Sequence, residues 1–177
     1  MLFSDRSLLT MLHGIGMGGG ALLALSAALF AVYLLRPRAG AAGLAATRAG
    51  AISAVTAIAA GLTWLTTLAG TYIIFPPYRA TPPEGASDLA AYPRSLLLAE
   101  PATAWLHGFA METKEHLPFI AAMLATSVAF VAWRYRERLL EEAGLRRLGE
   151  SLLLGCFVIV AYVSLRGVFV NKVAPLE

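Results

Sequence analysis

Three histidines and two glutamates are the side chains of this sequence whose types and spacing could do chemistry. His107 and His116 belong to the segment HGFAMETKEH, which also carries Glu112 and Glu115, whereas His13 stands near the N-terminus. In an α-helix Glu112 and His116 share a face, but His107 and His116, nine residues apart, differ by about half a revolution. Two such imidazoles cannot easily ligate one iron. His13 is therefore the better partner for His116, with His107 as the substitute.

Glycines follow His13 closely, and they suit the approach of a flat cofactor. On a helix Gly16 and Gly20 fall on the face of His13 or beside it, so a macrocycle ligated by His13 would meet a nearly bare backbone. This pattern favours a b-type haem with axial imidazoles from His13 and His116. The G-x-x-x-G pairs also allow two helices to pack closely without any cofactor, beside a structural histidine. Another metal or a bound lipid is a further alternative.

The two carboxylates allow three interpretations. Glu112 or Glu115 could accept a proton from a quinol as its electrons pass to a haem. With His13 and His116 they could instead hold a metal, although Glu-x-x-Glu-His is incomplete for a di-iron site, which needs a second such helix. They could also form a solvated helix face with Lys114.

Arg166 and a stripe of threonines lie near these candidates. Arg166 could pair with a haem propionate or with Glu112, or extend to lipid head groups. Thr63, Thr67 and Thr71 recur every four residues and could face a cofactor or satisfy backbone carbonyls of their own helix.

The composition shows what scaffold must position these residues. Of 177 residues 58% are hydrophobic and 14% charged, whereas a soluble domain usually has about 25% charged residues. Four stretches reach the ~20 apolar residues that a bilayer requires; they cover residues 8–35, 50–75, 110–134 and 150–170. The sequence predicts one all-α domain over 1–177, an integral membrane four-helix bundle with up-down-up-down topology. The first stretch is too long for a cleavable signal, so we expect it to be retained as a span.

Basic residues predict the orientation. Eight lie in the two short loops: Arg36, Arg38, Arg48, Arg134, Arg136, Arg138, Arg146 and Arg147. Six are spread more thinly over the other side: Arg6, Arg79, Arg94, Lys114, Arg166 and Lys172. The positive-inside rule places the short loops in the cytoplasm and both termini outside a bacterial inner membrane. Because the basic residues follow the loops, they indicate topology and not nucleic-acid binding.

The connection over residues 76–104 is then an external loop. It is rich in proline, which opposes a regular helix or a central strand. The apolar residues 95–99 within it are expected to lie on the membrane surface or against a partner.

The four predicted spans, His13 with its glycines, and His116 together are similar to the small b-haem membrane anchors of respiratory dehydrogenases. That resemblance of architecture implies a subunit of a larger membrane complex, which exchanges electrons between a quinol and an external redox partner such as a cytochrome. The sequence departs from the dihaem members, because its cytoplasmic half has no histidine. Two alternatives remain open. One is a non-catalytic accessory subunit, and the other is a metal-handling protein with copper ligands among Met11, His13, Met17, His107 and Met111.

Overall fold

The computed structural model describes residues 4–35 and 42–175, without the side chains of residues 42–49, 137 and 140. Over these residues the chain forms helices and no strand. The first span consists of α1 (Asp5–Met11), the π-helix η1 (Leu12–Gly18) and α2 (Gly19–Leu34), and the second of α3 (Ala42–Ala69), η2 (Gly70–Ile74) and α4 (Phe75–Tyr78). The third consists of α6 (Pro101–Trp105), η3 (Leu106–Met111) and α7 (Glu112–Arg134), and the fourth is α9 (Ala143–Val173). Two short helices, α5 (Pro93–Ala99) and α8 (Arg136–Glu141), lie in the connections.

The predicted all-α membrane fold is confirmed. Four helical stretches are long and apolar enough to cross a bilayer: Asp5–Leu34, Gly50–Tyr78, Pro101–Arg134 and Ala143–Val173. The boundaries differ from the prediction at the proline-rich connection. The second span continues through Pro76 and Pro77 to Tyr78, beyond its predicted end at residue 75. The helix of the third span begins at Pro101, as expected for proline, which fits the first turn of a helix because its missing N–H costs nothing there.

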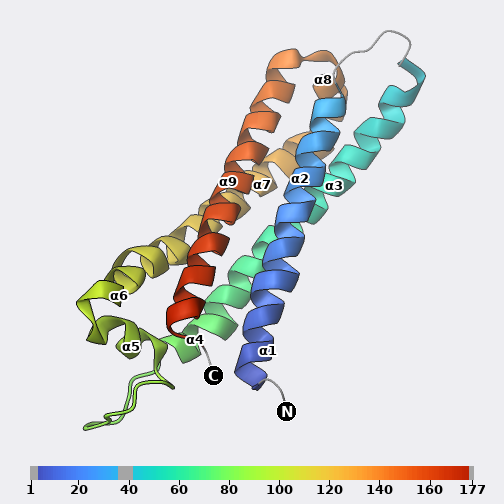
Figure 1. Cartoon of the computed structure of the whole chain (residues 1–177). Coiled ribbons are helices and arrows are strands. Elements are labelled where there is room, and N and C mark those ends of the chain that lie inside the picture. Colours follow the sequence, from blue (N-terminus) through green and yellow to red (C-terminus); the bar gives the residue numbers. More distant parts are fainter. Residues whose placement is uncertain (1–3, 36–41, 176–177) are drawn as a thin grey trace.

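The spans form a closed bundle in which α2 and α7 each pack against both α3 and α9. Figure 1 shows α4, α5 and both ends of the chain at one end of the bundle and α8 at the other. We call these the terminal end and the α8 end. Two arginines of the orientation argument, Arg36 and Arg38, lie outside the described residues.

Alanines fill the centre of the bundle. Ala21, Ala28, Ala59, Ala121 and Ala122 are all fully buried. Small side chains let backbones approach closely, which matters in lipid, where helices gain little from burying larger apolar groups against one another.

The threonine stripe bonds to its own helix. The hydroxyls of Thr63, Thr67 and Thr71 donate to the carbonyl oxygens four residues earlier, at 2.7, 2.7 and 2.9 Å. Two roles were predicted for this stripe, to face a cofactor or to satisfy backbone carbonyls of its own helix. The observed hydrogen bonds correspond to the second role.

The proline-rich connection folds back onto its own chain. Leu97 of α5 is fully buried in a second apolar cluster with Tyr78, Leu106, Met111 and Val170. The expectation that residues 95–99 lie on the membrane surface or against a partner does not hold for Leu97, which packs against its own chain. This cluster packs the end of the second span, α5 and the third and fourth spans against one another at the terminal end.

At the α8 end Arg146 is buried, with 5% of its surface exposed, and its Nη1 donates to the carbonyl oxygen of Leu139 at 2.9 Å. This arginine therefore also holds α8 against α9. A basic residue that the sequence assigned to topology thus has a structural role as well.

Candidate functional site at the terminal end

Three π-helical segments at the terminal end contain residues of the candidate site. His13 lies in η1, Gly70 begins η2 and His107 lies in η3. A π turn inserts an extra residue into a helix, is less favourable than an α turn, and is frequent at functional sites. It also rotates the residues on its two sides relative to each other, so α-helical face assignments fail across it.

The imidazole of His13 packs against the backbone of the second span. A Cβ on Gly70 would lie 3.0 Å from Cε1 and 3.2 Å from Nε2 of His13. Because Gly70 has no side chain, the ring can lie between the spans. Its Nδ1 is buried and has no hydrogen-bond partner among the described residues. A buried polar atom without a partner is costly, and it indicates that a ligand group or water completes this position.

Lys114 lies in the same region. A Cβ on Gly167 of α9 would stand 3.0 Å from Nζ of Lys114, so a second glycine accommodates a second polar side chain. Lys114 lies close enough to His13 to interact with it electrostatically. In the part of the chain that the structure describes, no carboxylate forms an ion pair with Lys114. An unpaired lysine within a span is a functional candidate by default, and the interpretation of Lys114 as part of a solvated face does not fit this position.

His107 is held by two neighbours instead of facing His13. Arg94 Nε donates to His107 Nε2 at 3.3 Å, and His107 Nδ1 lies 3.0 Å from the hydroxyl of Tyr78. Since arginine only donates, Nε2 carries the lone pair and Nδ1–H donates to the Tyr78 oxygen. Both ring nitrogens are engaged, so His107 is not free to act as the substitute iron ligand.

The two glutamates border this network. Glu112 is exposed and Glu115 is half-buried. Glu115 lies close enough to Arg79, Arg94 and Glu112 to interact with them electrostatically. The carboxylates therefore lie beside the His107–Tyr78–Arg94 cluster.

His116 faces outward from the bundle. Its ring is exposed, and its Nδ1–H donates to the carbonyl oxygen of Glu112 at 2.7 Å. It shares its side of α7 with the exposed residues Ile120, Met123 and Phe130. His13 instead faces Gly70 and Lys114, so the structure does not bring the two predicted axial ligands together.

The glycines of η1 and α2 also differ from the prediction. Gly16 is exposed, and a Cβ added to either Gly16 or Gly20 would have no atom of another span within 4 Å. Gly18 is the residue that approaches another span, with its Cβ position 3.8 Å from Oγ of Ser164. The bare backbone that His13 meets belongs to Gly70.

Arg166 lies over three aromatic rings instead of against Glu112. Its guanidinium carbon is 5.6 Å from the Trp105 ring, 5.2 Å from Phe109 and 4.9 Å from Tyr162. These cation–π contacts fasten the part of the third span at the terminal end to α9. Arg166 is therefore a structural residue of this end.

Sequence reasoning missed Gly70, Gly167, Tyr78 and Arg94 as members of the site. Gly70 and Gly167 could have been found from the sequence, because each lies on another span at a depth similar to that of a polar side chain, His13 or Lys114. Nothing in the spacing of Tyr78 and Arg94 predicted their meeting with His107, because the proline-rich connection brings them together.

Comparison with protein-family models, curated proteins and solved structures gives no match. The function must therefore be argued from the site.

Proposed function

We propose that this chain is a membrane subunit of a larger redox complex and that it binds a quinol head group between His13 and Lys114. Two polar side chains inside apolar spans support this function. The buried Nδ1 of His13 has no hydrogen-bond partner among the described residues, and Lys114, which interacts with His13 electrostatically, has no carboxylate partner among them. A quinol has two oxygens on opposite edges of one ring, and each can form a hydrogen bond with such a group. Its isoprenoid tail would remain in the lipid.

The residues around this position could manage the protons. Oxidation of a quinol to a quinone releases two protons and two electrons, and the electrons would pass to a redox group of a partner subunit, such as an external cytochrome. The imidazole of His13, in its neutral form, can accept one proton from the quinol. Glu115 or Glu112, beside the His107 cluster, would take the second. Lys114 would donate a hydrogen bond to a quinol oxygen.

A b-type haem is the second candidate. The bond from His116 Nδ1 to Glu112 orients the ring and leaves Nε2 free, an arrangement common in metal-bound histidines. The residues do not fit a haem held by two histidines of one chain, since His116 is exposed, His13 faces inward and His107 is engaged. A haem on His116 would need any second axial ligand from a group other than His13 and His107.

Binding of a short-chain quinone to the purified chain tests the proposal, with quenching of tryptophan fluorescence as the readout. We expect His13→Ala and Lys114→Met to weaken binding roughly tenfold, the loss of about one buried hydrogen bond. The control Lys172→Met changes an exposed lysine and should bind as the unsubstituted chain does. Equal binding by all four proteins would refute the quinol site.

The intact complex, purified through a tag on this chain, separates the other candidates. Loss of quinol oxidation in His13→Ala with retained assembly supports the proposal. Normal oxidation in that variant, together with disassembly after deletion of residues 79–92, would identify a non-catalytic accessory subunit. A Soret absorption band that disappears in His116→Ala but persists in Lys114→Met would favour the haem.

A further inference from the structure

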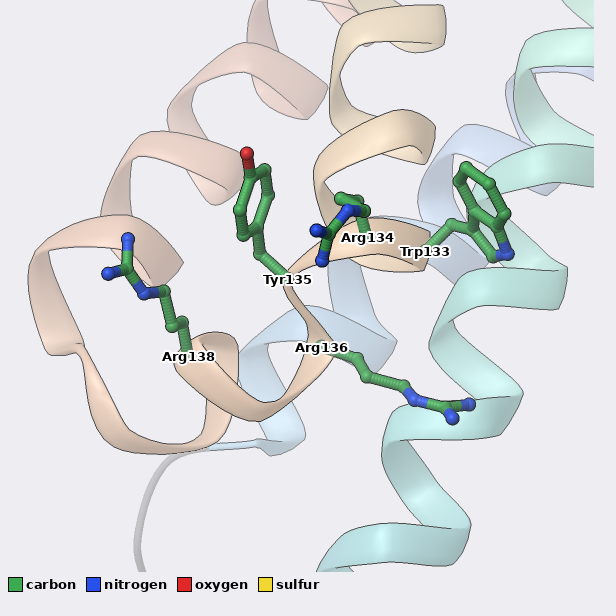
Figure 2. Close-up of a pocket in the computed structure, with 5 residues that line it drawn as sticks. All are labelled: Trp133, Arg134, Tyr135, Arg136 and Arg138. Carbon is green, nitrogen blue, oxygen red and sulfur yellow. The ribbon is translucent and has the colours of Figure 1, made fainter.

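A basic and aromatic corner lies at the α8 end, far from the site described above. The helix α7 ends at Arg134, Tyr135 leaves the helical conformation with φ −122° and ψ 28°, and α8 begins at Arg136. The turn surrounds an open hollow of about 580 Å³, and its lining consists of Trp133, Arg134, Tyr135, Arg136 and Arg138. Figure 2 shows Arg134, Tyr135 and Arg138 on one side of the turn, whereas Arg136 extends toward α3.

The guanidinium groups of this corner form few ion pairs with the described side chains. The guanidinium carbons of Arg134 and Arg138 lie 5.4 and 5.9 Å from the centroid of the same Tyr135 ring. Within the part of the chain that the structure describes, their one carboxylate partner is Glu142, 3.6 Å from Arg138 Nε, and both side chains of that pair are exposed. Exposed pairs of this kind contribute little stability. Two cations beside one ring therefore leave room for an anion.

We propose that this corner binds the phosphodiester head group of an anionic phospholipid. The corner directly follows a span, and Trp133 and Tyr135 are 67% and 39% exposed, as aromatic residues at the level of lipid head groups are. Guanidinium groups bind phosphate oxygens through paired N–H donors. Basic pockets at the ends of spans are the usual sites for anionic lipids, and this hollow has the size of an ordinary ligand pocket, about 300–1,000 Å³.

The arrangement assigns a role to each residue. Arg134 and Arg138 bind the phosphate from the side of Tyr135, whose ring keeps the two guanidinium groups in place. Arg136 extends from the other side of the turn toward α3 (Figure 2), so it is not assigned to the phosphate. The lipid would attach the turn between α7 and α8 to the membrane surface.

Thermal unfolding of the full chain in a neutral detergent tests this inference. We expect added phosphatidylglycerol, but not phosphatidylcholine or the same concentration of inorganic phosphate, to raise the unfolding temperature. Arg134→Gln should bind phosphatidylglycerol roughly tenfold more weakly, the loss of one charge-assisted contact. Arg147→Gln is the matched control, because it removes one exposed arginine from the same end of the bundle.

Each other outcome would overturn the inference. An equal effect of the lipid on Arg134→Gln and Arg147→Gln would mean that only overall charge matters. An equal effect of inorganic phosphate would identify a site for free anions and not for lipid. If Arg134→Gln unfolds early without lipid, Arg138→Gln takes its place, and unchanged lipid binding by that variant would also refute the site.

Discussion

The imidazole of His13 lies directly over Gly70, with the Cβ position of residue 70 only 3.0 Å from Cε1 of the ring. One missing side chain on the second span thus decides where the histidine of the first span points. The pair couples η1 to η2 at the terminal end, and it provides the most direct test of the site geometry.

Gly70→Val should displace the His13 ring, because a branched side chain requires the space that the ring occupies. We expect a loss of about 1–3 kcal/mol in the free energy of unfolding, the usual cost of overpacking. Gly61→Val is the control, since a Cβ at Gly61, which lies in α3 of the same span, has no neighbour within 4 Å. The double variant His13→Ala/Gly70→Val should recover part of the loss. Strictly additive effects in this cycle would show that the two residues do not interact.

Lys114→Met should leave the fold intact or stabilise it while it weakens quinone binding roughly tenfold. An unpaired ammonium group within apolar spans is costly, and an apolar side chain of similar length removes that cost. We expect the free energy of unfolding to stay equal or rise by about 1–3 kcal/mol, measured by denaturation in mixed micelles. A large loss of stability would mean that Lys114 is a structural residue and would weaken the proposed function.

Tyr78→Phe should loosen the proline-rich connection. The substitution removes the acceptor of the His107 Nδ1–H and leaves this group without its partner, at a cost of about 1–3 kcal/mol. Limited proteolysis within residues 79–92 should become faster. Tyr72→Phe, whose ring is 73% exposed, serves as the control; equal cleavage of both variants would contradict the hydrogen bond as the cause.

Arg146→Met should destabilise the α8 end. The substitution preserves most of the side-chain volume but removes the buried bond to the Leu139 carbonyl, and charged hydrogen bonds of this kind contribute about 1.5–3 kcal/mol. Arg147→Met, at an exposed position of the same helix, should change the free energy of unfolding by no more than about 0.5 kcal/mol. If both variants unfold alike, Arg146 acts only through its charge.

The candidate site could be predicted only in part. The sequence singled out His13, Glu112 and Glu115 from their types and positions, but it paired His13 with His116. Depth along a helix follows from counting residues, whereas direction around the helix depends on its winding. The π turns at η1 and η3 change that winding, and the outward direction of His116 became visible only with the packing of α7.

The sequence by itself determined that this chain contains four apolar helical stretches long enough to cross a bilayer. In lipid every backbone N–H and C=O must be satisfied within its own segment, so length and hydropathy define a span without any knowledge of its neighbours. Tertiary structure alone decided which residues lie together: His13 with the backbone of Gly70 and near Lys114, and His107 with Tyr78 and Arg94. These contacts depend on the space that glycines leave between spans and on the proline-rich connection, which folds back onto the bundle. Both conditions arise only when segments distant in the sequence pack together.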